Sequence, residues 1–493
     1  MPQRVGIIGA GIAGLAAAVR LKAQGFEVTV FEANDYVGGK LHAITLQGYR
    51  FDLGPSLFTM PDYVDALFEL FGEDPREHFN YLRKDVVCNY FWEDQTQFSA
   101  LADPEKFVQD FSERFGEDPK KVQSFLTKNA KKYNLTHPLF IEKSLHRLGT
   151  YTTFNTLKAI IQLPSLDLHK SLYRTLKGVF SHPKSIQFFS RHATYNGSSP
   201  YKTPGIMSLI PHLEMHFGTY YPEKGMHEIS QSIYRLAQRQ GVKFHLGEPV
   251  QRISMSDSTT ASGLQTTKAN YDFDIVVSNM DVVPTYRKLL PNLKAPERIL
   301  NQERSSSALI FYWGIRKRFD QLDLHNIFFS DHYQQEFDAI FNAKTLHDDP
   351  TVYVNITSKH TAEDAPAGCE NWFVMINVPG NYGQDWDELI NKSRERILAK
   401  LSRILGESIK DLIEVEHVLD PRGIEKTTQS FRGALYGAAS NSQFAAFLRH
   451  PNHRKALTNV YFCGGSAHPG GGIPLCLQSG KIVSELITHD RRT

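Results

Sequence analysis

The segment RVGIIGAGIAGLAAAVRLKAQGFEVTVFE, residues 4–32, decides the fold of the amino-terminal region. It opens with a short apolar run, passes through three glycines spaced as G-x-G-x-x-G, and continues as an apolar, helix-like stretch. It then returns as a second apolar run that ends at Glu32. A strand, a tight glycine turn, a helix, a second strand and an acidic residue together form the setting of a dinucleotide-binding fingerprint. The segment therefore predicts a βαβ unit that binds a nucleotide.

The three glycines of this turn have separate physical tasks. Gly9 allows the tight turn, Gly11 lets the backbone approach a pyrophosphate, and Gly14 lets the helix pack close to the sheet. The helix is predicted to start near Ile12, where free N–H groups and the helix dipole favour the pyrophosphate. Glu32 stands about 20 positions after Gly11, which is the spacing at which an acid accepts a hydrogen bond from a ribose hydroxyl.

Length and composition exclude several classes of protein. The 493 residues predict two or three domains, and the net charge of +2 gives no overall basicity that would indicate nucleic acid. The four cysteines, at 88, 369, 463 and 476, form no C-x-x-C pair, which argues against a disulfide framework or a metal site and fits a reducing compartment. The chain contains no run of about 18 apolar residues, so no transmembrane helix is predicted. The glycine-interrupted start is read as mature protein, not as a signal peptide.

A second glycine-rich turn lies near the carboxyl end. After a predicted strand at 459–462 the chain reads CGGSAHPGGGIP, residues 463–474, and Pro474 suits the first turn of a helix. Such dense glycine lets backbone approach a flat ligand. The following helix N-terminus offers positive potential, which suits a flavin that gains negative charge on reduction. With a single G-x-G-x-x-G in the chain, this turn predicts one bound dinucleotide, FAD.

The rest of the chain supplies further elements of the same kind. Gly38-Gly39-Lys40 follows the fingerprint, and Lys40 is placed to reach a phosphate or a ribose. A loop at 221–226 leads into a predicted helix, and strands are predicted at 242–246, 249–255 and 274–278, the last of which ends at Asn279. Farther on, strands are predicted at 309–313, 352–357 and 372–378, followed by a helix at 386–405.

Residues 143–191 differ in composition from their surroundings. They hold eight lysines and arginines against one acid, Asp167, with leucine, isoleucine and phenylalanine interleaved. A basic amphipathic segment of this kind is typical of a membrane-surface element. A solvated basic face on an ordinary cap domain explains the pattern equally well, and nucleic acid is a poor third, since no recognised motif is present.

Taken together, these motifs resemble the bacterial and fungal phytoene desaturase family of FAD-dependent carotenoid desaturases. The resemblance rests on the fingerprint with Glu32, on Gly38-Gly39-Lys40, on the turn YPEKGM at 221–226, and on HPGGGIP at 468–474. The stretch YNGSSPY at 195–201 and the ending GIPL at 472–475 are more similar to the branch that acts on hydroxylated carotenoids, the 1-hydroxycarotenoid 3,4-desaturases. One departure is Lys224, where the family turn usually has a glycine.

The resemblance implies an α/β fold with a discontinuous Rossmann-like FAD-binding domain made of residues 1–85, 222–285 and 456–493. An inserted mixed α+β substrate domain would comprise 86–221 and 286–455, with a helical membrane-facing part that includes the candidate contact segment 143–191. Contacts to FAD are implied for Gly9, Ala10, Gly11, Ile12, Ala13, Gly14, Glu32, Ala33, Gly39, Lys40, Leu41, Gly54, Pro55, Ser56, Val250, Asn279, Gly464, Gly465, Gly471, Gly472, Ile473 and Pro474.

The implied reaction introduces a C=C bond into a carotenoid, most simply one with a hydroxylated acyclic end or a monocyclic one. A hydride passes to FAD and a proton is then lost from the neighbouring carbon. Three residues are candidates for the base: His468, Glu142 and His192. Without a nicotinamide fingerprint, a quinone or oxygen is expected to reoxidise the flavin. A cytoplasmic protein associated peripherally with a membrane surface is expected, because the substrate dissolves in lipid.

Several alternatives remain open on the sequence. A phytoene desaturase, a carotenoid cis–trans isomerase, a retinoid saturase or an amine oxidase would share the fold and the flavin. A non-enzymatic prenyl-binding protein of the GDP-dissociation-inhibitor type would share the glycine-rich start without FAD. The dense glycine turn at 463–474 argues against the last of these.

Overall fold

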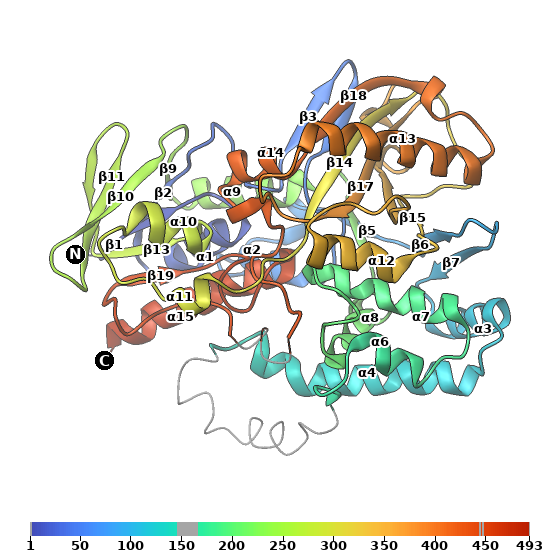
Figure 1. The fold of residues 1–493 in the computed structure, drawn as a ribbon. Helices are drawn as coiled ribbons and strands as arrows, with labels where there is room; N and C mark the ends of the chain where they lie inside the picture. The colour runs from blue at the N-terminus through green and yellow to red at the C-terminus, as the bar shows by residue number, and fades with distance from the viewer. Residues whose placement is uncertain (1, 145–165, 443–444, 446–447, 493) are drawn as a thin grey trace.

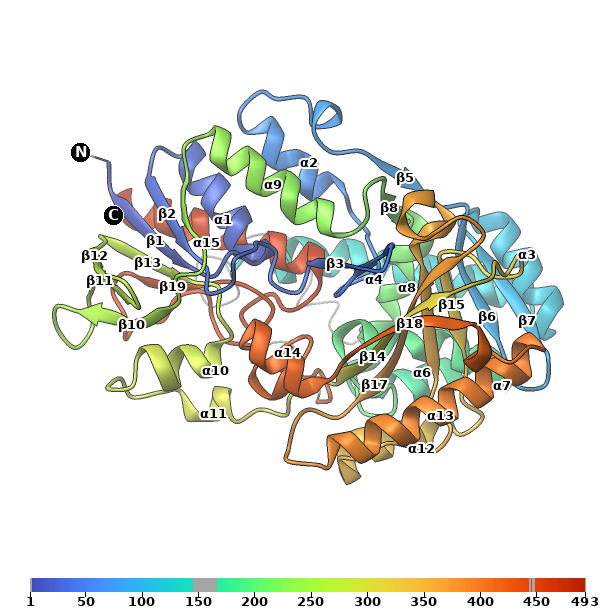
Figure 2. The ribbon, with the colours of Figure 1, turned by 90° about the horizontal axis from the view of Figure 1, so that it is seen from above.

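The computed structural model describes residues 2–144, 166–442, 445 and 448–492. A parallel sheet with its helices lies on one side of the molecule and a larger sheet on the other, with a helical layer below the larger sheet (Figure 1). The view from above shows β3 (Ala43–Leu46), which pairs with β4 (Tyr49–Asp52), near the middle, between these parts (Figure 2). Among the described helices, none combines the length and apolar character that a membrane crossing requires.

Five parallel strands form the first sheet, and they come from distant parts of the chain. In spatial order they are β19 (Val460–Phe462), β13 (Ile275–Ser278), β1 (Arg4–Ile8), β2 (Glu27–Phe31) and β9 (Lys243–His245). All five were predicted as strands: four are short, mostly apolar runs, and β9 lies in the alternating stretch at 242–246. The predicted domain boundaries themselves stay a prediction.

Three helices cover one face of this sheet. Helix α1 (Ile12–Ala23) is packed between α9 (His227–Arg239) and α15 (Ile473–Arg492), so it is buried on nearly all sides. This explains why its sequence is apolar all round instead of amphipathic. The predicted inner face of α9, which includes Ile229 and Ile233, is fully buried in the same core.

A seven-stranded mixed sheet forms the second half of the molecule. Its order is β18 (Ile413–Leu419), β14 (Ser307–Ile315), β17 (Glu370–Val378), β16 (Val352–Ile356), β15 (His325–Phe328), β6 (Val86–Phe91) and β7 (Gln97–Leu101). The predicted strands at 309–313, 352–357 and 372–378 are confirmed, as is the helix at 386–405, which is α13 (Trp386–Leu405). All nine residues of β14 are buried, because core side chains pack against both faces of the strand.

The helical layer buries a large aromatic cluster. It contains α3 (Pro104–Phe115), α4 (Pro119–Phe140), α6 (Leu172–Lys177) and α7 (Pro183–Ser190). The apolar side chains of Leu172, Leu176 and Phe180 lie inside this cluster, so these three do not contribute to the membrane-surface element that was one of the two interpretations of segment 143–191. Val179 is partly buried against the same cluster, and the other apolar residues of that pattern, at 157–163, lie outside the described residues.

Smaller elements complete the fold. They are β3 (Ala43–Leu46), β4 (Tyr49–Asp52), α2 (Asp62–Glu69), β5 (Tyr81–Arg83), α8 (Ile210–His212), β8 (Tyr220–Pro222), β10 (Val250–Met255), β11 (Ala261–Thr266), β12 (Asn270–Asp272), α10 (Val282–Pro284), α11 (Glu297–Leu300), α12 (Tyr333–Asp338) and α14 (Pro421–Thr428), with short 3-10 and π turns between them. Strands β10, β11 and β12 form a separate antiparallel sheet. The chain therefore has an α/β fold with mixed sheets.

Candidate active site

The carboxyl ends of four neighbouring parallel strands meet at one edge of the first sheet. Gly9 follows β1, Glu32 follows β2, Asn279 follows β13, and Gly464 comes two residues after β19. In open parallel sheets, ligands bind in the crevice outside these carboxyl ends. All four residues line one large cavity, so the structure brings together turns that stand more than 400 positions apart in the chain.

The turn between β1 and α1 is packed too tightly for side chains. Gly9 has φ +93° and donates its N–H to Phe31 O at 2.7 Å. A Cβ on Gly14 would lie 2.2 Å from Gly9 O, and a Cβ on Gly11 would lie 2.8 Å from Asn279 Nδ2. Asn279 also donates from Nδ2 to Gly9 O at 3.2 Å, which fixes the turn against the next strand. A ligand can therefore approach the backbone at this edge, whereas Gly11 and Gly14 leave no room for a side chain.

Two helices, α1 and α15, begin at the wall of this cavity. Helix α1 has Gly11 as its N-cap with no side-chain cap, and neither α1 nor α15 has an acidic residue in its first turn. Ile12 and Ile473, the first residues of the two helices, both line the cavity. An uncapped N-terminus without competing acid attracts an anion, which fits the pyrophosphate of a dinucleotide at one helix and a reduced flavin at the other.

Glu32 holds the fingerprint turn together. Its carboxylate accepts from Ala10 N at 2.7 Å, from Asn34 N at 3.0 Å and from Asn34 Nδ2 at 2.9 Å. The residue is 7% exposed and lines the cavity. A carboxylate offers about four acceptor sites, so capacity remains for one further donor. The predicted contact to a ribose hydroxyl stays a prediction, and the link to Ala10 is a role that sequence spacing alone did not reveal.

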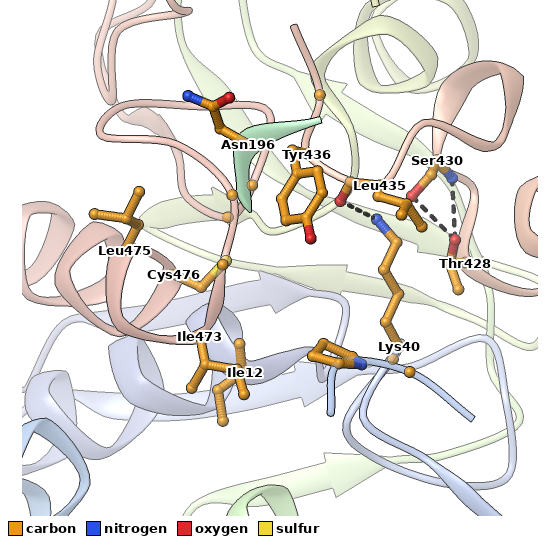
Figure 3. A pocket seen from close by; sticks show the side chains of 18 of the residues that line it. Ile12, Lys40, Asn196, Thr428, Ser430, Leu435, Tyr436, Ile473, Leu475 and Cys476 are labelled. Carbon is orange, nitrogen blue, oxygen red and sulfur yellow. Dashed lines mark hydrogen bonds between the residues drawn. The ribbon is translucent and has the colours of Figure 1, made fainter. Parts of the chain in front are cut away.

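Lys40 reaches across the cavity. Its ammonium donates to Leu435 O at 2.9 Å and to Ala434 O at 3.3 Å, and Figure 3 shows the side chain extending toward Leu435 beside Tyr436. Burial lowers the pKa of Lys40 to about 8, although Asp281 favours the charged form. A cation held here adds to the positive potential of the helix N-termini.

The cavity has a volume of about 1160 Å³. A single drug-sized ligand fills about 300–1,000 Å³, so the space suits a cofactor together with a second molecule. From the glycine turns the cavity extends over one face of the seven-stranded sheet, where it is lined by His417, Leu419, Ala308, Ile310, Phe373, Met375, Asn377, Thr351, Tyr353, His325, Ile327, Val87 and Cys88. These residues belong to or adjoin six neighbouring strands, which at a spacing of about 4.8 Å span roughly 24 Å.

Most of the predicted cofactor residues line this cavity, but two do not. Ala10 and Gly14 lie behind the turn, where they shape it without reaching the cavity. Of the three base candidates, only His468 lines the cavity; it is 2% exposed and its Nε2 lies 2.9 Å from Lys143 O. Glu142 and His192 are not part of the lining, and the His192 ring contacts Glu214 at 2.9 Å instead.

The two cysteines near the glycine turn are free thiols. Burial raises the pKa of Cys476 to about 11 and raises that of Cys463 further, so both thiols stay protonated. This agrees with their interpretation as small core residues rather than as a redox pair.

Sequence reasoning missed one wall of the cavity, formed by residues 427–437 with Arg449. Tyr436 and Arg449 line the cavity, and Arg449 donates to Tyr436 O at 2.9 Å. Burial lowers the pKa of Arg449 to about 10. The stretch GALYGAA at 433–439 is rich in small residues, and this is the signal that indicates a close backbone approach there.

Glu336 is a second missed residue. It lines the cavity at 3% exposure and accepts from Thr351 N at 3.0 Å and from Thr351 Oγ1 at 2.7 Å. Burial raises its pKa from 4.5 to about 7, although the bonds from Thr351 oppose the shift. Between pH 4.5 and 7 the folded carboxyl stays protonated while the unfolded one ionises, so this group makes folding less favourable as pH rises through that window.

Glu336→Gln is therefore expected to change stability in a pH-dependent way. The amide can keep both bonds to Thr351, so the variant and the parent should unfold alike near pH 5. Near pH 8.5 the variant should be more stable by about 3 kcal/mol, since each pKa unit is worth about 1.4 kcal/mol. Thermal unfolding at both pH values measures this, with Asp338→Asn on the exposed side of α12 as the control. An equal difference at both pH values would contradict the assignment.

Comparisons with known proteins agree with this geometry. A family model described as flavin containing amine oxidoreductase matches residues 12–488. A 1-hydroxycarotenoid 3,4-desaturase of Flavobacterium sp. (strain P99-3) is 59% identical over 483 residues, with 98% of each chain covered. A 4,4'-diapolycopene oxygenase of Methylomonas sp is 33% identical and covers 99% of this chain and 98% of its own. A solved structure of putrescine oxidase covers 99% of both chains with a TM-score of 0.65, and at 16% identity it shows a shared fold alone.

Proposed function

Because this chain belongs to the flavin-containing amine oxidoreductase family, we propose that it is an FAD-dependent desaturase of carotenoids. The proposed substrate carries a hydroxyl group at an acyclic end, either in an acyclic or in a monocyclic carotenoid. The name of the relative from Flavobacterium sp., at 59% identity over nearly the whole chain, supports this choice. The enzyme is a flavin oxidoreductase, and FAD is proposed over a smaller flavin because the fingerprint turn is built for a pyrophosphate.

One observation carries the proposal: a single cavity joins the two glycine turns to an extended apolar surface. The sheet face contributes Ile310, Met375 and Ile327, and the helical layer contributes Leu209 and Leu213. A polyene chain is long, apolar and nearly straight, so an apolar channel of roughly 24 Å along one sheet suits it.

When bound, the flavin supplies the capacity to accept a hydride. The chain's own residues bind and orient the substrate beside it and keep water away. The apolar lining excludes water from the reacting carbons. The N-termini of α1 and α15, whose first turns carry no acidic residue, would hold the negative charges of the cofactor. The proton lost from the neighbouring carbon needs an acceptor, and His468 is the base candidate from the sequence that borders the cavity.

The proposal also covers the domain division, the location of the protein and its electron acceptor. The cofactor domain comprises residues 1–85, 222–285 and 456–493, and the remainder forms the substrate domain. The protein acts in the cytoplasm and docks on a membrane surface, because a carotenoid dissolves in lipid, with segment 143–191 as the candidate contact. A quinone or oxygen accepts the electrons.

Expression in a host that makes several carotenoids tests the substrate. We expect one hydroxylated carotenoid to be replaced by a product with two hydrogens fewer and one further conjugated double bond. Chromatography with mass spectrometry identifies both compounds. Consumption of phytoene, a changed isomer of equal mass, or a pigment profile unaltered despite abundant yellow protein would each contradict the proposal.

A further inference from the structure

His325 occupies an unusual position in the cavity wall. It lies at the start of β15, lines the cavity and is 3% exposed. Its Nδ1 is 2.7 Å from Tyr353 Oη and 3.2 Å from Asn355 Nδ2, both on the neighbouring strand β16. Its Nε2 is buried and has no hydrogen-bond partner among the described residues. Buried polar atoms are nearly always paired, so an unpaired one in a cavity wall offers a hydrogen bond to a bound molecule.

The contacts of Asn355 determine which nitrogen of the ring carries the proton. Asn355 Nδ2 donates to Leu324 O at 2.9 Å, and a carbonyl can only accept, so the amide nitrogen of Asn355 is placed there. The same nitrogen faces His325 Nδ1, which must therefore accept. Burial lowers the pKa of His325 to about 3, so the ring is neutral near pH 7. The single ring proton is then on Nε2, which makes that atom an unpaired donor.

A chain of hydrogen bonds connects this donor to the predicted cofactor contacts. Tyr353 gives its only hydroxyl hydrogen to His325 Nδ1, so Ser56 Oγ, 2.8 Å away, donates to Tyr353 Oη. Ser56 belongs to the turn 54–56, which lines the cavity and was predicted to contact FAD. Two hydrogen bonds, through Tyr353, therefore connect the His325 ring to that turn. The contacts of Nδ1 with Tyr353 and Asn355 on β16 fix the orientation of the ring.

We propose that His325 is a specificity-determining residue whose Nε2–H donates a hydrogen bond to the hydroxyl oxygen of the substrate. This inference rests on the proposed function. In a substrate with a hydroxyl on C1 and a reacting bond at C3–C4, the oxygen lies about 4 Å from the first reacting carbon, given bonds of about 1.5 Å. A donor beside the turn at 54–56 is suitably placed for such an oxygen, whereas a hydrocarbon end would leave the N–H unpaired.

The test compares two substrates that differ only in the hydroxyl group. The purified flavin-loaded protein is assayed with a 1-hydroxylated carotenoid and with the analogue that lacks the hydroxyl, and kcat/KM is measured for both. His325→Leu, which removes the donor, should lower kcat/KM for the hydroxylated substrate about 10- to 100-fold, the effect of one buried hydrogen bond left unmade. The value for the analogue should stay the same or rise. His325→Gln keeps an N–H donor and should lose less.

Two controls separate the possible outcomes. Phe328 lies on the same strand but packs in the core on the other face of the sheet, so Phe328→Leu should leave the ratio between the substrates unchanged. Flavin content, measured by absorbance, should match the parent in all variants. If His325→Leu leaves the ratio of the two kcat/KM values unchanged, whether or not both values fall, the role of His325 is overturned. The proposed function would stay intact. Failure of the parent protein to turn over either substrate would overturn the proposed function itself.

Discussion

Gly14→Ala is expected to abolish flavin binding and to lower the free energy of unfolding by about 3–5 kcal/mol. The added Cβ would lie 2.2 Å from Gly9 O and 2.9 Å from Asn279 Nδ2, and neither neighbour can withdraw. Gly9 is fixed by its bond to Phe31 O, and Asn279 N donates to Ile8 O at 2.8 Å. Helix α1 must therefore shift away from the sheet, and it carries its N-terminus out of the position that suits the pyrophosphate.

Flavin content per protein and the thermal midpoint measure this effect. The flavin released by heating the parent protein should co-elute with FAD, which tests the identity of the cofactor in the same experiment. Gly178→Ala is the matched control, because its Cβ would meet no atom closer than 3.4 Å and its φ is −78°. It should retain the parent's flavin content. A Gly14→Ala protein that keeps its flavin would show that the turn does not hold the cofactor.

Glu214→Gln is expected to cost about 3–5 kcal/mol of stability, because it leaves a buried arginine without its counter-charge. Glu214 accepts from Arg191 Nη2 at 2.7 Å, and Tyr195 donates to its other carboxylate oxygen. Both charged residues are buried, at 2% and 6% exposure. Burial opposes ionisation of Glu214, but Arg191 and His192 outweigh it and lower its pKa to about 2.

Denaturant unfolding near pH 7 measures this loss. The stabilisation by Glu214 should be present above pH 4.5 and should disappear as the pH falls toward 2, so the difference between the parent and Glu214→Gln narrows in acid. The exposed pair Arg287–Glu297 provides the control, and Glu297→Gln should change stability little. A Glu214→Gln protein as stable as the parent would mean that the pair does not bear on folding.

The nucleotide-binding edge could be predicted from the sequence because its signals are local. The turn at 9–14, the acid at 32 and the glycines at 464–472 each sit directly after a short apolar strand, and parallel pairing brings the strand ends together. Helix α13 was predicted at its observed bounds for a similar reason: 20 residues with a clear apolar period end at Gly406.

The substrate side of the cavity could not be predicted in the same way. His325 and Tyr353 stand on short strands whose pairing depends on contacts far along the chain, and β15, β18, β6 and β7 were not predicted at all. Glu336 looks like an ordinary surface acid on a helix until the fold buries it. In the described part of segment 143–191, Leu172 and Leu176 pack in the core, which the composition of the segment alone did not indicate.

We propose that this protein removes two hydrogens from a hydroxylated carotenoid, with a bound flavin as the acceptor. Anaerobic mixing of the purified yellow protein with one equivalent of a 1-hydroxylated carotenoid tests it most directly. We expect the flavin absorbance to bleach while a carotenoid two hydrogens lighter forms, with its absorption shifted to longer wavelength. A flavin that stays oxidised beside unchanged carotenoid, or a product that has gained oxygen, would contradict it.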